Sequence, residues 1–231
     1  MTHEPFTFEG AQTPLQSFNL LAGEAPAAIG GYPKRMFDAL VAGICLLCGM
    51  PVLLFIAIAI KLSDGGPVFY RDRRIGWNGT HFRCMKFRSM SVDSAALLRD
   101  YLQKNQAAAL EWAQTRKLKS DPRVTRVGYL LRKSSLDELP QLINVLRGEM
   151  SLVGPRPICD QEVSMYGEVM QDYLRARPGL TGVWQVSGRN DVDYGKRTRL
   201  DREYIHTWNF WKDLWIILRT FRVVLSARGC Y

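Results

Sequence analysis

The chain lacks a disulfide framework. Its five cysteines are an odd number, scattered at Cys45, Cys48, Cys84, Cys159 and Cys230. This spacing excludes the class of small secreted domains that disulfides hold together. The Cys45-x-x-Cys48 pair has no second cysteine pair and no histidine near it, so we interpret it as apolar filling rather than as a zinc site. Cysteine usage therefore indicates a protein body in a reducing compartment.

Acidic residues are few relative to basic ones. Lysine and arginine number 31 against 22 aspartates and glutamates, which gives a formal net charge of +9. Such a balance favours acidic partners, namely phosphates, nucleic acid or anionic lipid. No recognition helix or base-stacking motif accompanies the charge, so we rank a module that only binds nucleic acid or anionic lipid below an enzyme. The 231 residues suffice for one sizeable domain with an appended membrane element.

Charge is missing altogether from one long stretch near the start of the chain. Residues 39–60 are 22 consecutive uncharged residues. As a helix they would extend about 33 Å, enough to cross the core of a bilayer. The stretch begins too late for a secretory signal peptide, so we expect none. Residues 1–31 are rich in alanine, glycine and proline without periodicity, and we predict a flexible leader there.

Pro51 and the flanking charges bear on how this apolar segment meets a membrane. Pro51 lies near the middle and predicts a bend or a break in the helix. Lysines and arginines flank both ends, which draws both ends towards the cytoplasmic face. A re-entrant helix that enters and leaves one leaflet satisfies both constraints. A proline-kinked spanning helix stays open on these grounds, and a buried helix of a soluble core is a third alternative.

The rest of the chain predicts a small mixed α/β domain, because short apolar strands alternate with helical patterns. Residues 208–225 interleave tryptophans with lysine and arginine on a helical pattern, which suits the bilayer interface, although packing on the core would give the same pattern. Strands are expected at residues 68–75, 80–90 and 181–186, the first two joined like a hairpin. Helices are expected at residues 93–118, 160–175 and 208–225, with a short one ending near residue 133.

Two adjacent carboxylates mark the most informative stretch, residues 132–157. Asp137 and Glu138 precede a short amphipathic helix, with Arg132 upstream and Arg156 between two prolines downstream. A carboxylate pair among guanidinium groups suits a phosphorylated, metal-bound substrate. The same residues fit a structural alternative, since Ser135-x-x-Glu138 has the spacing of a capping box at a helix start. Spacing alone leaves both interpretations open.

Several ordered motifs in residues 32–231 resemble one family. They are K-R-x-F-D at 34–38, the proline-containing apolar helix, K-F-R-S-M at 86–90, D-P-R-V-T at 121–125, L-R-K-x-S-L-D-E-L-P-Q at 131–141, G-P-R-P at 154–157, R-P-G-L-T-G at 177–182 and W-Q-V-S-G-R-N at 184–190. Together they resemble the bacterial sugar transferases, also called monotopic phosphoglycosyl transferases. The pattern is most similar to exopolysaccharide-initiating undecaprenyl-phosphate galactose or glucose phosphotransferases. One departure is Met50, where many relatives have serine before the proline.

The resemblance implies a domain organisation and a reaction. A re-entrant membrane helix over residues 32–62, broken near Pro51, would precede a catalytic domain over residues 63–231 that ends in an interfacial helix. The enzyme would move hexose-1-phosphate from UDP-galactose or UDP-glucose to undecaprenyl phosphate and release UMP, with Mg²⁺, at the cytoplasmic face of the bacterial inner membrane. We expect no nucleic-acid partner, and a homodimer stays open. The alternative is a membrane-tethered module that binds anionic lipid or nucleic acid without catalysis.

The resemblance also implies roles for single residues. Asp137 would be the nucleophile that carries a covalent phosphosugar, Glu138 the magnesium ligand and Arg132 a phosphate contact. Carboxylates can attack phosphorus, and magnesium is commonly held by one or two carboxylates together with substrate phosphates. Ordinary turn arginines or a basic surface facing lipid would explain the remaining cations equally well. The expected substrate-binding residues are Lys86, Arg88, Arg156, Arg177, Arg189 and Asn190.

Overall fold

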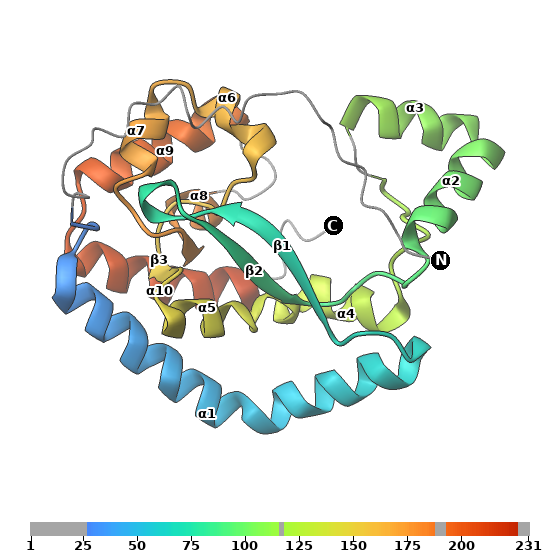
Figure 1. Cartoon of the computed structure of the whole chain (residues 1–231), viewed down its shortest axis with the longest axis horizontal. Helices are drawn as coiled ribbons and strands as arrows, with labels where there is room; N and C mark the ends of the chain where they lie inside the picture. Colours follow the sequence, from blue (N-terminus) through green and yellow to red (C-terminus); the bar gives the residue numbers. More distant parts are fainter. Residues whose placement is uncertain (1–26, 116–117, 188–192, 226–231) are drawn as a thin grey trace.

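The structure is a computed structural model that describes residues 27–115, 118–187 and 193–225. Figure 1 shows a long helix, α1, along one edge of a body built of shorter helices and strands. The predicted mixed helix-and-strand architecture is confirmed for this part of the chain. The elements are α1 (Gly31–Asp64), β1 (Phe69–Ile75), η2 (Trp77–Gly79), β2 (His81–Phe87), α2 (Ser94–Lys104), α3 (Gln106–Thr115), α4 (Arg126–Ser134), η3 (Leu136–Glu138), α5 (Gln141–Arg147), β3 (Ser151–Val153), η4 (Asp160–Glu162), α6 (Val163–Tyr166), α7 (Val169–Tyr173), β4 (Gly179–Thr181), α8 (Val183–Val186), α9 (Tyr194–His206) and α10 (Phe210–Leu225).

Helix α1 is apolar and largely exposed. It runs through Pro51 without interruption, so the proline bends the helix rather than breaking it, and Figure 1 shows α1 bending near its middle. The helix is long and apolar enough to cross a membrane: an 18-residue window within it has a mean hydropathy of 2.7, and only 11% of that window is buried. A helix in water rarely exposes such a surface, because the apolar area buried on folding stabilises the fold.

The predicted hairpin is confirmed. Strands β1 and β2 pair antiparallel from Phe69↔Phe87 to Ile75↔His81. The other edge of β2 is closed by the side chain of Asn144 from α5. Its Oδ1 accepts from the Met85 N–H at 2.9 Å, and its Nδ2 donates to the Arg83 carbonyl at 2.9 Å. An amide offers the same donor and acceptor as a backbone, so Asn144 substitutes for a further strand.

The main core lies where α5, the parallel pair β3–β4, α9 and α10 meet the first half of α1. Its fully buried members include Val145, Met150, Tyr204 and Ile216, with Ala42 from α1. Strands β3 and β4 lie close enough that a Cβ on Gly154 would come within 2.3 Å of the Arg177 carbonyl. Glycine is therefore required where the G-P-R-P segment passes the R-P-G segment.

Three predicted elements differ from the structure. The expected strand at 181–186 is wrong: β4 ends at Thr181 and Val183–Val186 form helix α8, a segment too short for apolar periodicity to distinguish the two. The expected helix at 93–118 divides at Asn105, whose side chain accepts from the Ala108 N–H and starts a new helix. The expected helix at 160–175 is three short pieces, because Gly167 takes a positive φ of 50° between α6 and α7.

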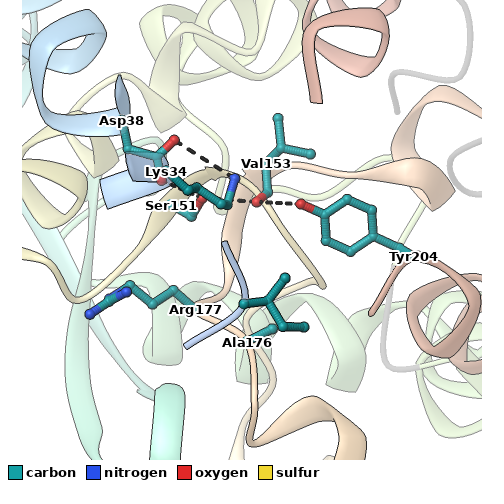
Figure 2. A pocket seen from close by; sticks show the side chains of 8 residues that line it. Lys34, Asp38, Ser151, Val153, Ala176, Arg177 and Tyr204 are labelled. Carbon is teal, nitrogen blue, oxygen red and sulfur yellow. Dashed lines mark hydrogen bonds and ion pairs between the residues drawn. The ribbon is translucent and has the colours of Figure 1, made fainter. Parts of the chain in front are cut away.

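Both ends of α1 bind the same body. At the first end, Lys34 donates to Asp213 of α10 at 2.5 Å and Asp38 accepts from the Ser151 hydroxyl at 2.7 Å. Figure 2 shows Lys34 and Asp38 beside Ser151 and Tyr204 around a small internal pocket. At the other end, Asp64 forms a two-pronged pair with Arg88, just beyond β2. The polar ends of α1 are therefore fixed, while its middle is left apolar and exposed.

Substituting Lys34→Met tests the first of these anchors. It leaves the buried Asp213 and Asp38 carboxylates without their cation, and breaking a buried pair costs about 3–5 kcal/mol of the free energy of unfolding. Thermal and denaturant unfolding in detergent measure this loss. The matched control is Lys61→Met in the last turn of the same helix, where the lysine is exposed and about 0.5 kcal/mol or less is expected. Equal losses for the two variants would contradict the anchoring role.

Candidate active site

Asp137 and Glu138 lie on a single tight turn between two helices. Helix α4 ends at Ser135, which takes the left-handed conformation with φ 58°, and η3 then carries both carboxylates. The Ser135 hydroxyl makes no capping bond to η3, and α5 begins only after Pro140. The capping-box alternative is therefore wrong. The Glu138 carboxylate turns to Lys86 instead.

Lys86 joins the carboxylate pair from the end of β2. Its Nζ lies 2.6 Å from Glu138 Oε1. Burial by itself would lower the pKa of Lys86. The charge of Glu138, the hydrogen bond to it and the charge of Asp137 outweigh burial and raise that pKa. Tyr70 of β1 is its cross-strand neighbour. The ammonium is therefore held in its charged form beside both carboxylates.

Arg132 approaches from the last turn of α4. Its Nε donates to the Ser89 hydroxyl at 2.8 Å. The approach depends on Gly128, because a Cβ there would lie 1.9 Å from the Ser89 carbonyl oxygen. Helix α4 can thus contact the chain directly after β2. Burial lowers the pKa of Arg132, and the Asp137 charge opposes that effect, so the guanidinium lies within electrostatic range of the carboxylate.

Asp137 is the perturbed member of the pair. Burial raises its pKa to about 6, the neighbouring Glu138 charge adds to the rise, and Lys86 and Arg132 oppose it. A carboxylate that is poorly hydrated yet mostly ionised at neutral pH is more reactive than a solvated one, and perturbed groups of this kind gather at functional sites. The arrangement can present one carboxylate oxygen to an electrophile between two cations.

The floor of this site is made by the second half of α1. Ile56 and Ile60 pack with Phe87 of β2 and Leu131 of α4, and Leu136 of η3 lies against the same cluster. All three protein segments that carry Lys86, Arg132 and Asp137 therefore rest on the apolar helix. Arg88 also fixes α1 beneath the site, since it is buried and pairs with Asp64 at the end of that helix. The structure thus places Arg88 as an anchor of α1.

Arg156 lies in a second polar cluster, on the loop after β3. Its guanidinium is 5.3 Å from the centre of the Trp184 ring, and Arg197 lies 4.4 Å from the same ring. Arg156 Nε, Trp184 Nε1 and the Tyr194 hydroxyl are buried and have no hydrogen-bond partner in the part of the chain that the structure describes. Buried polar atoms without partners are costly, so this cluster is suited to receive a polar ligand.

The remaining predicted residues are not gathered at the carboxylate pair. Arg177 donates to the Gly148 carbonyl at 2.9 Å and lies 5.0 Å from the Trp77 ring centre. Arg189 and Asn190 lie outside the described residues. Sequence reasoning assigned no role to Ser89, although it belongs to the K-F-R-S-M motif. Trp184, Tyr194 and Arg197 carried no spacing signal, because only the tertiary fold brings them to Arg156.

Within residues 27–115, 118–187 and 193–225, no three histidine, cysteine, aspartate or glutamate side chains gather as a metal site. The carboxylates of Asp137 and Glu138 offer hard oxygen donors, the ligand type that Mg²⁺ prefers. Magnesium commonly takes its other ligands from substrate phosphates and water. Asp137 and Glu138 therefore fit a magnesium ion that is bound partly by the protein and partly by the substrate.

Comparison with known proteins agrees with the motifs. The family model described as bacterial sugar transferase matches residues 30–227. The exopolysaccharide production protein ExoY of Rhizobium meliloti is 51% identical over 203 residues, covering 88% of this chain and 90% of the relative. An undecaprenyl-phosphate galactose phosphotransferase of Salmonella typhimurium is 46% identical over 198 residues, 86% of this chain and 41% of the relative. A UDP-glucose:undecaprenyl-phosphate glucose-1-phosphate transferase of Caulobacter vibrioides is 38% identical over 217 residues, 90% of this chain and 76% of the relative.

Asp201 gives the second cluster a pH dependence that can be measured. Its carboxylate accepts from the Tyr166 hydroxyl at 2.9 Å and from the Arg156 backbone, and burial raises its pKa to about 7. The folded protein therefore binds more protons than the unfolded chain between about pH 4 and pH 7. The stabilisation of the folded state by protonated Asp201 is fully present below about pH 4 and is lost as the pH rises to about 7.

Substituting Asp201→Asn removes this titration. Relative to the variant, the wild type should lose about 1 kcal/mol of unfolding free energy per pH unit between pH 5 and 7. Denaturant unfolding across that range measures the difference, with Asp100→Asn on the exposed surface of α2 as the control. A difference that does not change with pH would contradict the raised pKa.

Proposed function

The chain belongs to the bacterial sugar transferase family, and we propose that it transfers hexose-1-phosphate from UDP-galactose or UDP-glucose to undecaprenyl phosphate. The names of its relatives support an undecaprenyl-phosphate hexose phosphotransferase of exopolysaccharide production. One observation of geometry carries the mechanism: a half-buried Asp137 is held beside Glu138 between Lys86 and Arg132. The transfer is the first membrane step of exopolysaccharide synthesis.

The first step forms an aspartyl phosphate. An Asp137 oxygen attacks the phosphorus that bears the sugar, the bond from that phosphorus to the UMP oxygen breaks, and UMP leaves with the electron pair. The product is hexose-1-phosphate joined to Asp137 as an acyl phosphate. Lys86 and Arg132 offset the repulsion between the attacking carboxylate and the diphosphate, an interaction worth up to about 4 kcal/mol per pair near a protein surface.

The second step regenerates the enzyme. An oxygen of undecaprenyl phosphate attacks the same phosphorus, and the Asp137 carboxylate leaves. The product is undecaprenyl diphosphate-sugar. Dividing the exchange into two displacements lets one positioned carboxylate serve a water-soluble donor and a lipid acceptor in turn. Asp137 and Glu138, the dyad, lie on η3, which packs on α1. This location supports the order of the steps, because the acceptor phosphate would arrive at the bilayer surface.

Magnesium would be held by Glu138 together with phosphate oxygens of the donor. When bound, it supplies positive charge that neutralises the diphosphate. Lys86 occupies the Glu138 carboxylate at 2.6 Å, so the ammonium must yield when Glu138 takes another cation. A lysine on a flexible stem can then turn to the substrate phosphate, as the predicted substrate contact requires.

The Arg156 cluster is placed to receive the nucleotide part of the donor. The buried Trp184 ring holds Arg156 in place, and Arg156 supplies a cation with an unsatisfied buried Nε. Its position on a proline-bounded loop keeps the guanidinium in place before the substrate binds. Arg177, Arg189 and Asn190 stay predictions as substrate contacts.

Helix α1 would lie in the cytoplasmic leaflet as a re-entrant segment. A straight helix of its length extends about 51 Å, yet Lys34 at one end and Asp64 at the other both pair with the same polar body. A spanning helix would separate those ends by the bilayer. Helix α10 adds an apolar, tryptophan-bearing surface with Trp211, Trp215 and Leu218 exposed, as suits the interface.

Substituting Asp137→Asn tests the nucleophile. UMP release from UDP-sugar should fall by at least about 10⁴-fold, because the amide cannot form the acyl phosphate. Mass spectrometry of the wild type mixed with UDP-sugar, without lipid acceptor, should show a sugar-phosphate adduct that the variant lacks. Asp100→Asn is the control for the loss of a carboxylate. Full turnover by Asp137→Asn, with its fold and membrane fractionation intact, would remove Asp137 from this role.

Substituting Glu138→Gln tests the metal ligand separately. The amide keeps the size of the side chain but loses its charge, so the magnesium concentration for half-maximal activity should rise by at least about tenfold. Activity titrated with MgCl₂ after removal of divalent ions with EDTA gives this value. An unchanged magnesium dependence would assign the ion to other residues while leaving the aspartyl phosphate in place.

A further inference from the structure

A basic hollow lies on the opposite face of the β1–β2 hairpin from the dyad. Side chains of a strand alternate between faces, so Lys86 points to Glu138 while Arg83 and Met85 lie on the other side. The hollow has a volume of about 630 Å³, within the range of small-molecule sites, about 300–1,000 Å³. Its lining is Arg71, Arg73, His81, Phe82, Arg83, Met85, Arg147 and Glu149.

The arginines of this hollow are poorly compensated. Arg73 and Arg83 are direct cross-strand partners, an arrangement that destabilises a hairpin because like charges repel. Arg73 reaches Asp160 at 3.7 Å, whereas Arg71, Arg83 and Arg147 form no ion pair with the described residues. The one carboxylate in the lining, Glu149, is bonded to Asn144 at 2.5 Å. An anion would relieve this repulsion, and the concentrated charge would attract one.

The hollow borders the membrane helix. Arg147 is the last residue of α5, and the two residues before it, Val145 and Leu146, accept hydrogen bonds from Arg35 of α1 at 2.7 and 2.6 Å. Leu146 lies against Gly43 of α1 and is itself exposed. The hollow therefore adjoins the apolar surface of α1. Basic pockets beside membrane helices on the cytoplasmic side are the sites that anionic lipid head groups prefer.

We propose that Arg71, Arg73, Arg83 and Arg147, together the arginine basin, bind the phosphate head group of an anionic phospholipid. The inference rests on the proposed placement of α1 in the leaflet, since that placement brings head groups to Arg147. The lipid's acyl chains lie along the exposed surface of α1. A lipid held there sets the height and tilt of the body, so that the dyad on the other hairpin face stays at the bilayer surface.

Native mass spectrometry of the full-length chain in a neutral detergent tests the basin. The chain is titrated with phosphatidylglycerol, phosphatidylcholine or inorganic pyrophosphate. The variant Arg71→Gln/Arg83→Gln removes two basin charges, and the matched control Arg99→Gln/Arg199→Gln removes two exposed charges from α2 and α9. Each arginine near an anionic surface accounts for about a fivefold change in lipid affinity. The basin variant should therefore bind phosphatidylglycerol about 25-fold more weakly than the wild type, while the control binds like the wild type.

Equal phosphatidylglycerol binding by all three chains, or equal binding of phosphatidylcholine and phosphatidylglycerol by the wild type, would overturn the proposal. Pyrophosphate binding that matches phosphatidylglycerol would assign the basin to free phosphates instead. Weaker binding of undecaprenyl phosphate itself by the basin variant in the same detergent titration, where no bilayer positions the chain, would make the basin part of the acceptor site, which also overturns the proposal. Membrane fractionation tests the placement of α1 separately from the basin. A wild type found in the soluble fraction refutes the placement of α1. A membrane-bound wild type without lipid preference refutes the basin alone.

Discussion

Two neighbouring carboxylates, Asp137 and Glu138, repel each other, and the rest of the site is arranged to offset that repulsion. Burial raises the pKa of Asp137 to about 6, and the charge of Glu138 on the same tight turn adds to the rise. Lys86 and Arg132 offset that cost from two different segments. Each cation is in turn fixed by a neighbour, Lys86 by Glu138 and Arg132 by Ser89. The fold thus keeps a strained charge cluster ready at neutral pH.

Helix α1 links this charge cluster to the long apolar surface that we propose faces the membrane. Its second half supplies the floor beneath η3, β2 and α4, and its first half enters the main core. Ion pairs hold both of its ends to the body, so the apolar middle can stay exposed while the segments that carry Lys86, Arg132 and Asp137 keep their places. A change that detaches α1 would therefore be expected to disturb Asp137 and Glu138 as well, since Leu136 beside them packs on the second half of α1.

Much of this could be predicted from the sequence, and the limits have physical causes. The uncharged run, the hairpin and the D-E pair show in composition, alternation and spacing, because each is a local property. The capping box at Ser135 failed because a left-handed turn and a distant lysine decide where Glu138 points. Arg88 stays a predicted substrate contact, but its pairing with Asp64 depends on tertiary structure and could not be predicted from the motif. The grouping of Arg156 with Trp184 depends on long-range packing, which no local pattern records.

The aspartyl phosphate is the central claim, and exchange of labelled UMP into UDP-sugar tests it most directly. The purified chain is incubated with UDP-sugar, labelled UMP and Mg²⁺ in the absence of undecaprenyl phosphate. If Asp137 carries the phosphosugar between two separate displacements, the first step reverses by itself and label enters UDP-sugar without any acceptor. Exchange that occurs only when undecaprenyl phosphate is present would contradict the covalent route and require donor and acceptor to react together.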